Sequence, residues 1–440
     1  MMPDAISQQG FKVLYHTFGC KLNFAETASV ADIFAARGHR PVAKGEVPDI
    51  IVVNSCSVTA EADRKCRSQL RSFHRRYPDA AILVTGCYAQ LKPQEVAGIE
   101  GVKAVAGIND KLLLVDVAEQ LASGSYAGSV VVPSKDLHDF MPSCSRGDRT
   151  RYFLKVQDGC DYWCSYCTIP RARGRSRSGS IEDIVAQAKA AAAHGGREIV
   201  LTGVNIGDFG HGRDDNFLDL CRALDGVEGI ERYRISSIEP NLLTDEIIDF
   251  VAASRAFMPH FHVPLQNGTD EVLALMRRRY DTAFFRSKIE RIRSVIPDAF
   301  IGIDLIVGAR GETDELFERS RQFVESLDVS HVHVFSYSER PDTQALKIEH
   351  VVSQEEKHHR SEIMHRVSAG KHEAFARRFL GTVRPVLIEH PHSDHPVGGF
   401  TDNYLRIETQ LDPSFDNRIV KLSLESIMPD GETIKASMPS

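Results

Sequence analysis

The most reactive feature of the sequence is a close triplet of cysteines, Cys160, Cys164 and Cys167, in a C-x3-C-x2-C run. Three thiolates at this spacing can each bind one iron of a single [4Fe–4S] cluster. The fourth iron then has no protein ligand and is free to bind a substrate. A zinc site would require a fourth Cys or His, and none occurs in the next twenty residues. The run therefore predicts a cluster with one open iron, with zinc or buried structural cysteines as the alternatives.

Three further cysteines, Cys20, Cys56 and Cys87, are far apart in the chain but share one context. Each lies at the end of an apolar run that is typical of a buried parallel strand. The carboxyl ends of parallel strands lie along one edge of a sheet, where ligands bind. We therefore predict that these thiolates meet and bind a second cluster with an open iron. The alternative is that they are small buried hydrophobes, which is the role predicted for Cys66, Cys144 and Cys221.

Polar side chains at the ends of other expected strands suggest a ligand pocket near the triplet. For each one alone, the alternative is a structural polar residue at a strand end. Barrel proteins, however, place their sites at the carboxyl ends of their strands. One of the candidates begins a strand instead, directly after Gly195, Gly196 and Arg197. Together they favour a pocket lined by Glu198, Ser237, Glu239, His262 and Gln266.

Two groups of arginines are candidates for contacts with phosphates. If residues 60–77 form a helix, Arg67, Arg71 and Arg75 recur at every fourth position and share one face. A solvated helix face is the alternative interpretation. The second group directly follows the cysteine triplet and comprises Arg171, Arg173, Arg175 and Arg177. A surface role is about as consistent with the run at residues 277–279.

The elements that must position these residues alternate between strand and helix. In the first part of the chain, apolar runs predict strands at residues 11–17, 49–54, 80–85 and 102–106. Helical patterns lie between and after them, at residues 23–37, 60–77 and 111–121. Such alternation predicts a doubly wound parallel sheet. Residues 129–150, rich in Ser, Gly, Pro and Asp, predict a linker with one strand at 129–132.

The second part alternates again, with six expected strands at residues 152–157, 198–205, 232–238, 261–266, 300–307 and 331–337. Six β–α units are fewer than the eight that close a TIM barrel, so we predict a partial (β/α)6 barrel. A long helix is expected at residues 353–379, and short alternating runs from residue 381 predict a small all-β module. The expected domains are therefore residues 1–128, 151–380 and 381–440, with the linker at 129–150.

Composition narrows the classes of function. The 440 residues are 42% apolar, yet none of the apolar stretches approaches the roughly 20 residues of a membrane span. The start of the chain lacks a signal-peptide pattern, so a cytoplasmic location is expected. The net charge of −7 argues against bulk attraction to nucleic acid, which leaves local basic patches for any RNA contact. The C-terminal module is itself acidic, so it either contacts RNA through few residues or mainly packs against the barrel.

Several motifs resemble those of the methylthiotransferase family of radical S-adenosylmethionine (SAM) enzymes, and the resemblance covers nearly the whole chain. Around the first three cysteines they are TFGCKLN (17–23), NSCSVT (54–59) and GCYAQ (86–90). After the triplet they are ARGRSRS (172–178), LTGVN (201–205), SSIEP (236–240), VPLQNG (263–268) and GET (311–313). The resemblance implies a methylthiotransferase domain, a radical SAM core and a C-terminal TRAM-like β-domain.

The resemblance also implies the chemistry. Two [4Fe–4S] clusters are expected, and SAM serves both as methyl donor and as radical source. An open iron chelates SAM, one electron splits its S–C5′ bond, and the resulting radical abstracts hydrogen from C2 of an adenine. Tyr166 and Asn205 join the expected SAM-binding residues on this basis. The loop arginines would then hold substrate phosphates, the SAM carboxylate or a threonyl carboxylate.

Three branches of the family differ in substrate. Two modify adenosine 37 of tRNA, which carries either an isopentenyl or a threonylcarbamoyl group, and the third modifies an aspartate of a ribosomal protein. The run EADRKCRSQLR (61–71) resembles the threonylcarbamoyl branch, which is therefore the predicted function. Expected partners are a tRNA anticodon stem-loop, a flavodoxin- or ferredoxin-type electron donor and a sulfur donor, with the protein a monomer away from membranes. A non-catalytic iron–sulfur scaffold is the distant alternative.

Overall fold

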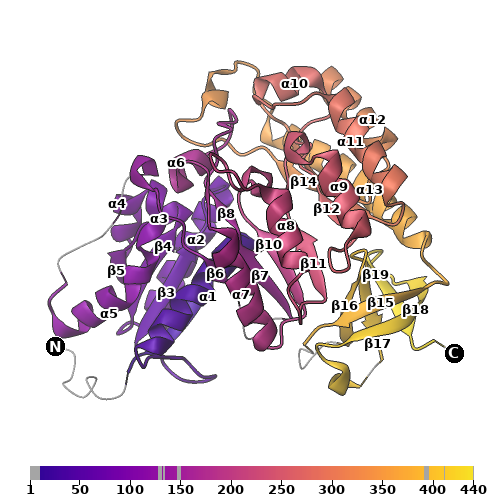
Figure 1. Ribbon diagram of the computed structural model, residues 1–440. Helices are drawn as coiled ribbons and strands as arrows, with labels where there is room; N and C mark the ends of the chain where they lie inside the picture. Colours follow the sequence, from indigo (N-terminus) through magenta and orange to yellow (C-terminus); the bar gives the residue numbers. More distant parts are fainter. Residues whose placement is uncertain are drawn as a thin grey trace.

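The computed structural model describes residues 10–126, 131, 134–145, 150–390, 396–410 and 412–439. Three units follow one another along the chain: an N-terminal α/β unit, a curved sheet of parallel strands wrapped by helices, and a small C-terminal β-barrel (Figure 1). The strand expected at residues 129–132 falls, apart from Val131, outside the described residues. In the described ranges, helices long and apolar enough to cross a membrane are absent.

The N-terminal unit is a five-stranded parallel sheet in the order β2-β1-β3-β4-β5. Its strands are β1 (Lys12–Thr17), β2 (Arg40–Pro41), β3 (Ile50–Ser55), β4 (Ala81–Gly86) and β5 (Val102–Val105). Helices α1 (Lys21–Ala36) and α5 (Leu114–Ser123) cover one face through a core around Phe34. Helices α2 (Ala60–Arg76), α3 (Cys87–Leu91) and α4 (Pro93–Ala97) pack on the other around Leu70. The doubly wound prediction is confirmed.

The central unit contains six parallel strands: β7 (Arg151–Lys155), β10 (Glu198–Thr202), β11 (Arg232–Ile235), β12 (His260–His262), β13 (Phe300–Val307) and β14 (His331–Ser336). Ladders join β11-β10-β7 and β12-β13-β14, and the two halves meet through the parallel bridges Tyr233–Phe257 and Ser237–His262. The outer helices are α7 (Ile181–Ala193), α8 (Phe217–Asp225), α9 (Asp245–Ala253), α11 (Thr282–Val295), α12 (Asp314–Ser326) and α13 (Gln354–Arg377). This open barrel of six units confirms the predicted fold.

Some strands end earlier than the apolar patterns predicted. The strand β12 ends at His262 rather than at Gln266, because Pro264 has no N–H to donate to a ladder. Gln266 instead has a positive φ of 69° and bridges to Leu305 of β13. The chain therefore turns out of the sheet directly above β12, in the region where barrel sites form.

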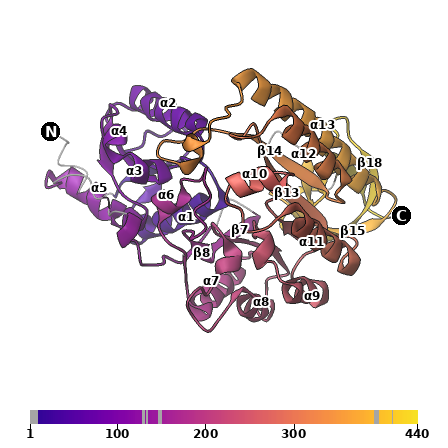
Figure 2. The ribbon, with the colours of Figure 1, turned by 90° about the horizontal axis from the view of Figure 1, so that it is seen from above.

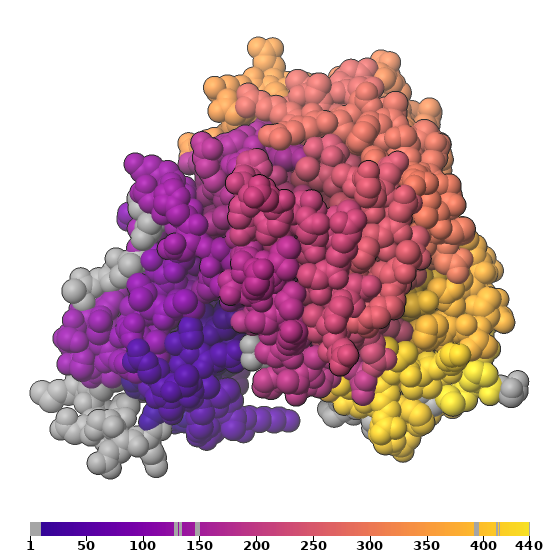
Figure 3. Space-filling view, in the orientation of Figure 1, coloured from indigo at the N-terminus to yellow at the C-terminus, as the bar shows by residue number. Residues whose placement is uncertain are grey.

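The C-terminal module is a closed barrel in the order β15-β16-β17-β19-β18. Its strands are β15 (Val383–Ile388), β16 (Val397–Thr401), β17 (Arg406–Thr409), β18 (Ile419–Ile427) and β19 (Thr433–Ser437). Its core continues into Phe375 and Phe379 at the end of α13 and Phe300 at the start of β13. The module thus closes the amino end of the open barrel, and it forms one continuous mass with it in the space-filling view (Figure 3).

Candidate functional site

The N-terminal cysteine trio lies at one edge of the first sheet. Cys20 is the N-cap of α1, Cys56 directly follows β3, and Cys87 begins α3 directly after β4. The strands β1, β3 and β4 are neighbours, so their carboxyl ends deliver the three thiols together. A Cβ added to Gly19, which has φ +96°, would lie 2.9 Å from Cys56 Sγ. Burial, and after it the neighbouring Cys87, raise the pKa of Cys56 to about 11.

The second trio lies on the loop between β8 (Gln157–Asp158) and α6 (Ile169–Arg173), above the carboxyl end of β7. The loop begins with a tight turn at Gly159 (φ +70°), where a Cβ would come within 2.0 Å of the Arg175 carbonyl oxygen. Burial raises the pKa of both Cys160 and Cys167 to about 12. Backbone N–H groups of Tyr162 and Ile169 donate to these two sulfurs at 3.4 Å. The loop therefore offers donors to sulfur anions that burial alone would disfavour.

The geometry of the two trios suits a cluster better than a single ion. In the described part of the chain, three His, Cys, Asp or Glu side chains never converge closely enough to bind one metal ion. A [4Fe–4S] cluster contacts its cysteines through separate irons and accepts a wider triangle of sulfurs. Each trio offers three soft thiolate donors, the ligand type that iron–sulfur clusters take. The donor sets therefore fit such clusters.

Arg278 contacts the second trio, and the sequence pattern missed it because it lies in a run of three arginines that resembles a solvated surface. Its side chain is 2% exposed, and its Nη1 donates to Cys164 Sγ at 3.2 Å. It also forms an ion pair with Glu239 and donates through Nε to the Tyr280 hydroxyl at 3.1 Å. Arg278 thus places a fixed positive charge between a cluster cysteine and a strand-end carboxylate.

The other predicted pocket residues gather above the carboxyl ends of the strands. Ser237 and Glu239 follow β11, and Asn205 follows β10. Asn205 is 2% exposed, and neither polar atom of its side-chain amide has a hydrogen-bond partner among the described residues. A buried amide without partners is costly unless a ligand satisfies it. This orphaned amide therefore supports a polar ligand beside the Cys160 loop, which also carries Tyr166.

The structure corrects the prediction that Glu198 lines the ligand pocket. It begins β10, so it lies at the amino end of the barrel, opposite the pocket. Its carboxylate is fully buried and accepts from Arg234 Nε at 2.8 Å, with Arg232 Nη1 at 3.7 Å. These two arginines also donate to backbone carbonyls of the C-terminal module, including Thr401 and Phe400. Glu198 therefore anchors that module and does not contact a SAM-binding site.

The role of Glu198 can be tested by Glu198→Gln. Removing one partner of a buried ion pair leaves Arg234 uncompensated, so the free energy of unfolding should fall by about 3–5 kcal/mol. The control Glu231→Gln breaks an exposed pair with Arg197, which should cost less than about 1 kcal/mol. Denaturant titration measures both. A loss of SAM affinity in folded Glu198→Gln, with unchanged stability, would restore the original assignment.

The structure also corrects the ligand-binding role that was predicted for two of the four loop arginines. Arg173 is 1% exposed and donates to Glu26, to Asp158 at 2.9 Å and to Asn23 at 2.7 Å. Arg177 donates to Asp158 at 3.2 Å and to backbone carbonyls. Because both guanidinium groups are paired with buried carboxylates, neither side chain is free to bind phosphate. Arg171 pairs with Asp342 at 2.9 Å, and Arg175 is the exposed member of the loop.

Arg173 belongs to a buried ionic hub between the first two units, which consists of Glu26, Lys111, Lys155, Asp158 and Arg173. Glu26 lies on α1, which packs along β6 (Ser143–Cys144) and β7 beside the barrel (Figure 2). Asn23, which accepts from Arg173, donates to the carbonyls of Phe18 and Ser55 next to two of the N-terminal cysteines. The hub thus connects the loop of one trio to the loops of the other.

The predicted arginine stripe on α2 is present, but its members differ. Arg67 is half-buried and donates to Glu95 at 3.0 Å and to the Tyr88 hydroxyl at 2.9 Å. Arg71 and Arg75 are exposed, and ion pairs of their side chains are absent within the described residues. The two outer arginines are therefore the members of the stripe available to a phosphate backbone.

Two family descriptions match the chain: "Uncharacterized protein family UPF0004" over residues 12–107 and "Radical SAM superfamily" over residues 154–324. The chain is 34% identical over 420 residues to a threonylcarbamoyladenosine tRNA methylthiotransferase, MtaB, of Bacillus subtilis, covering 94% of this chain and 93% of that protein. It is also 34% identical to the MtaB of Thermotoga maritima, covering 90% and 91%. A tRNA-2-methylthio-N6-dimethylallyladenosine synthase of Hydrogenobaculum is 28% identical, covering 89% and 92%.

Among solved structures, the radical SAM methyltransferase TsrM of Kitasatospora setae is similar in fold. Its complex with tryptophan and a SAM analogue has a TM-score of 0.55 at 15% identity, covering 73% of this chain and 72% of that one. Its complex with cobalamin and a [4Fe–4S] cluster has a TM-score of 0.53 at 16% identity. At these identities the likeness concerns the fold alone.

Proposed function

Because this chain belongs to the methylthiotransferase family of radical SAM enzymes, we propose that it converts N6-threonylcarbamoyladenosine at position 37 of tRNA to the 2-methylthio derivative. The observation that carries this proposal is the pair of cysteine trios, each at the carboxyl edge of a parallel sheet and joined through the ionic hub. The identities support the substrate, since relatives named for the threonylcarbamoyl base are 31–34% identical and those named for the dimethylallyl base 28–30%.

In this proposal Cys20, Cys56 and Cys87 hold one [4Fe–4S] cluster, and Cys160, Cys164 and Cys167 hold the other. When bound, the clusters and SAM supply the one-electron chemistry that activates an aromatic C–H bond and the methylthio group that replaces its hydrogen. SAM lies above the barrel, against Tyr166, Asn205, Ser237, Glu239, His262 and Gln266. Residues 1–128, 151–380 and 381–440 then act as the methylthiotransferase, radical SAM and TRAM-like domains.

The chain itself contributes orientation and charge. Arg278 holds Glu239 in place and donates to Cys164 Sγ, so the carboxylate and the cluster loop keep a fixed relation. The buried hub fixes the separation of the two trios, because moving either unit would break several paired charges at once. Such positioning is how a protein directs a reactive cofactor at a single carbon atom.

We further propose that Arg71 and Arg75 contact tRNA phosphates. Each lost phosphate contact should weaken binding at all sequences and lower the slope of log Kd against log salt by about 1. Arg71→Ala and Arg75→Ala should each show this change, measured by filter binding of the tRNA over a salt series. Arg222→Ala, which removes an exposed arginine of α8, should keep the wild-type slope. A wild-type slope in both α2 variants would rule out this surface.

The remaining partners follow from the chemistry. The reaction consumes electrons and sulfur, so we propose a flavodoxin- or ferredoxin-type electron donor and a separate sulfur donor. We also propose that the protein acts as a monomer on the tRNA anticodon stem-loop in the cytoplasm, where that substrate occurs. The acidic C-terminal module is proposed to act mainly by closing the barrel, since the barrel residues Arg232 and Arg234 donate to its backbone carbonyls.

Mass spectrometry of nucleosides tests the substrate. Cells that lack this gene should lose 2-methylthio-threonylcarbamoyladenosine, and expression of the intact gene should restore it. Loss of the 2-methylthio-isopentenyl nucleoside instead would assign the chain to that branch. An unchanged nucleoside profile together with an unmodified ribosomal-protein aspartate would move it to the third. Absence of SAM cleavage by reduced, reconstituted protein would favour the non-catalytic scaffold.

A further inference from the structure

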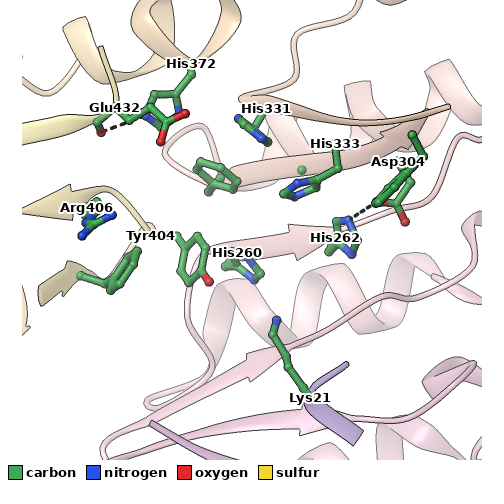
Figure 4. Close-up of a pocket in the computed structure, with 14 residues that line it drawn as sticks. Lys21, His260, His262, Asp304, His331, His333, His372, Tyr404, Arg406 and Glu432 are labelled. Carbon is green, nitrogen blue, oxygen red and sulfur yellow. Dashed lines mark hydrogen bonds and ion pairs between the residues drawn. The ribbon is translucent and has the colours of Figure 1, made fainter. Parts of the chain in front are cut away.

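A cavity of about 540 Å³ lies inside the open barrel, between the inner faces of β12, β13 and β14 and the C-terminal module. We call it the lumen pocket. Its walls carry five histidines, the aromatic rings of Phe300, Phe335 and Tyr404, and the ammonium group of Lys21 (Figure 4). Its volume falls in the range of about 300–1,000 Å³ that is typical of small-molecule sites.

The lumen pocket borders the start of α1 on one side and the proposed SAM-binding residue His262 on another. At one end, the backbone carbonyl oxygen of Asp304 accepts from the backbone N–H of Gln266 at 2.8 Å. Gln266 belongs to the proposed SAM site. On another side, Lys21 enters from the start of α1 and directly follows Cys20 in the chain. A group bound in this cavity would therefore contact Lys21, which is next to Cys20 in the chain, and His262 of the proposed SAM site. This position suits the substituent of the base being modified.

Lys21 and Arg406 are the two cations that line the cavity, and neither is in an ion pair with a carboxylate of the described residues. In the described part of the chain, carboxylates within ion-pair distance of Lys21 Nζ are absent. Asp304 is already held by His262 Nε2 at 3.0 Å. Arg406 lies at the opposite end of the pocket from Asp304, and Lys21 points toward His260 between these ends, nearer the Asp304 side than Arg406 is (Figure 4).

The histidines around Lys21 leave its charge uncompensated. Burial lowers the pKa of His331 to about 3 and that of His333 to about 4, so both imidazoles are neutral near pH 7. Neutral imidazoles can donate or accept hydrogen bonds but cannot neutralise an ammonium group. A shared metal ion is also not supported, since the described residues contain no group of three ligands that converge on one point.

We propose that the lumen pocket binds the threonylcarbamoyl group of the substrate base, with the Lys21 ammonium paired to its carboxylate. This assignment rests on the proposed function and names the contact that selects its substrate. The aromatic walls accept the planar ureido and methyl parts, and the neutral imidazoles of His331 and His333 bond the ureido and hydroxyl groups. A dimethylallyl group in the same place would displace water from the half-exposed Lys21 without supplying an anion, which disfavours that base.

The test compares anticodon stem-loops that carry threonylcarbamoyladenosine, its methyl ester or isopentenyladenosine. Binding is measured by fluorescence anisotropy with anaerobically reconstituted full-length protein. Wild type should bind the free acid about 10- to 100-fold more tightly than the neutral ester, as a charge-assisted pair predicts. In Lys21→Met the acid should weaken by a similar factor and the ester by less than about threefold. Lys21→Arg should retain the preference.

The controls separate this inference from the proposed function. Lys103→Met removes an exposed lysine on the edge strand β5 and should bind like wild type. Equal affinity of wild type for acid and ester, or a preserved preference in Lys21→Met, would overturn the inference even if methylthiolation of the base is observed. The wild-type comparison needs no variant, so it stays decisive if Lys21→Met loses iron. Failure of wild type to methylthiolate the acid form would instead overturn the proposed function and this inference with it.

Discussion

Cys164→Ala is expected to abolish reductive cleavage of SAM. The thiolate is one of three anchors of the proposed SAM-binding cluster, and it is the one that receives Arg278 Nη1 at 3.2 Å. Its removal should lower the iron content of reconstituted protein from about eight to about four per chain, since each [4Fe–4S] cluster carries four. The measurements are iron analysis and chromatographic detection of 5′-deoxyadenosine after reduction. Product formation should disappear together with cleavage.

The matched control is Cys221→Ala. Cys221 is fully buried in the apolar core of the barrel, among Leu220 and Leu224 of α8. This variant removes a sulfur of the same chemical type but should keep the full iron content and SAM cleavage. If Cys164→Ala cleaved SAM at the rate of Cys221→Ala, the assignment of the triplet would fail.

Cys56→Ala should separate the two halves of the reaction. It removes an anchor of the other proposed cluster, so iron should again fall to about four per chain. The barrel, its cysteine loop and the Arg278–Glu239 pair lie outside this edge of the N-terminal sheet, so SAM cleavage should continue. Sulfur transfer should not, because we propose that the cluster held by Cys20, Cys56 and Cys87 is the one that supplies the sulfur. The expected result is 5′-deoxyadenosine without methylthiolated nucleoside.

The contrast between the two cysteine variants is more informative than either alone. Loss of both activities in Cys56→Ala with wild-type iron content would point to collapse of the domain interface rather than loss of a cluster. Circular dichroism and the elution volume of the variant distinguish this case. Methylthiolation by Cys56→Ala at wild-type rate would falsify the second cluster outright.

Much of the architecture was predictable because it depends on local patterns. The strands β3 and β4 are buried on both faces and therefore appear as continuous apolar runs. Alternating strands and helices imply parallel sheets whose carboxyl ends share an edge. From that rule alone, Cys20, Cys56 and Cys87 were expected at one edge, and their strands are neighbours in the sheet.

The errors in the predicted site have one physical cause. Glu198, Arg173 and Arg177 were assigned to ligands because they are charged and lie close to cysteines or strand ends in the chain. Whether a charge faces a ligand or a buried partner depends on segments far away in sequence: Arg173 meets Glu26 across 147 positions, and Arg234 meets Thr401 across 167. Composition and periodicity contain no information on such pairs.

The sequence by itself predicted the proposed ligands, which are two sets of three thiols at strand ends or on a short loop, because element type and cysteine spacing are local properties. Only the tertiary structure decided what surrounds them. It placed Arg278 against Cys164, Glu198 at the opposite end of the barrel, and Lys21 in a cavity lined by histidines. The reason is that the energy of a buried charge is set by its neighbours in space, and those neighbours come from all three units of the chain.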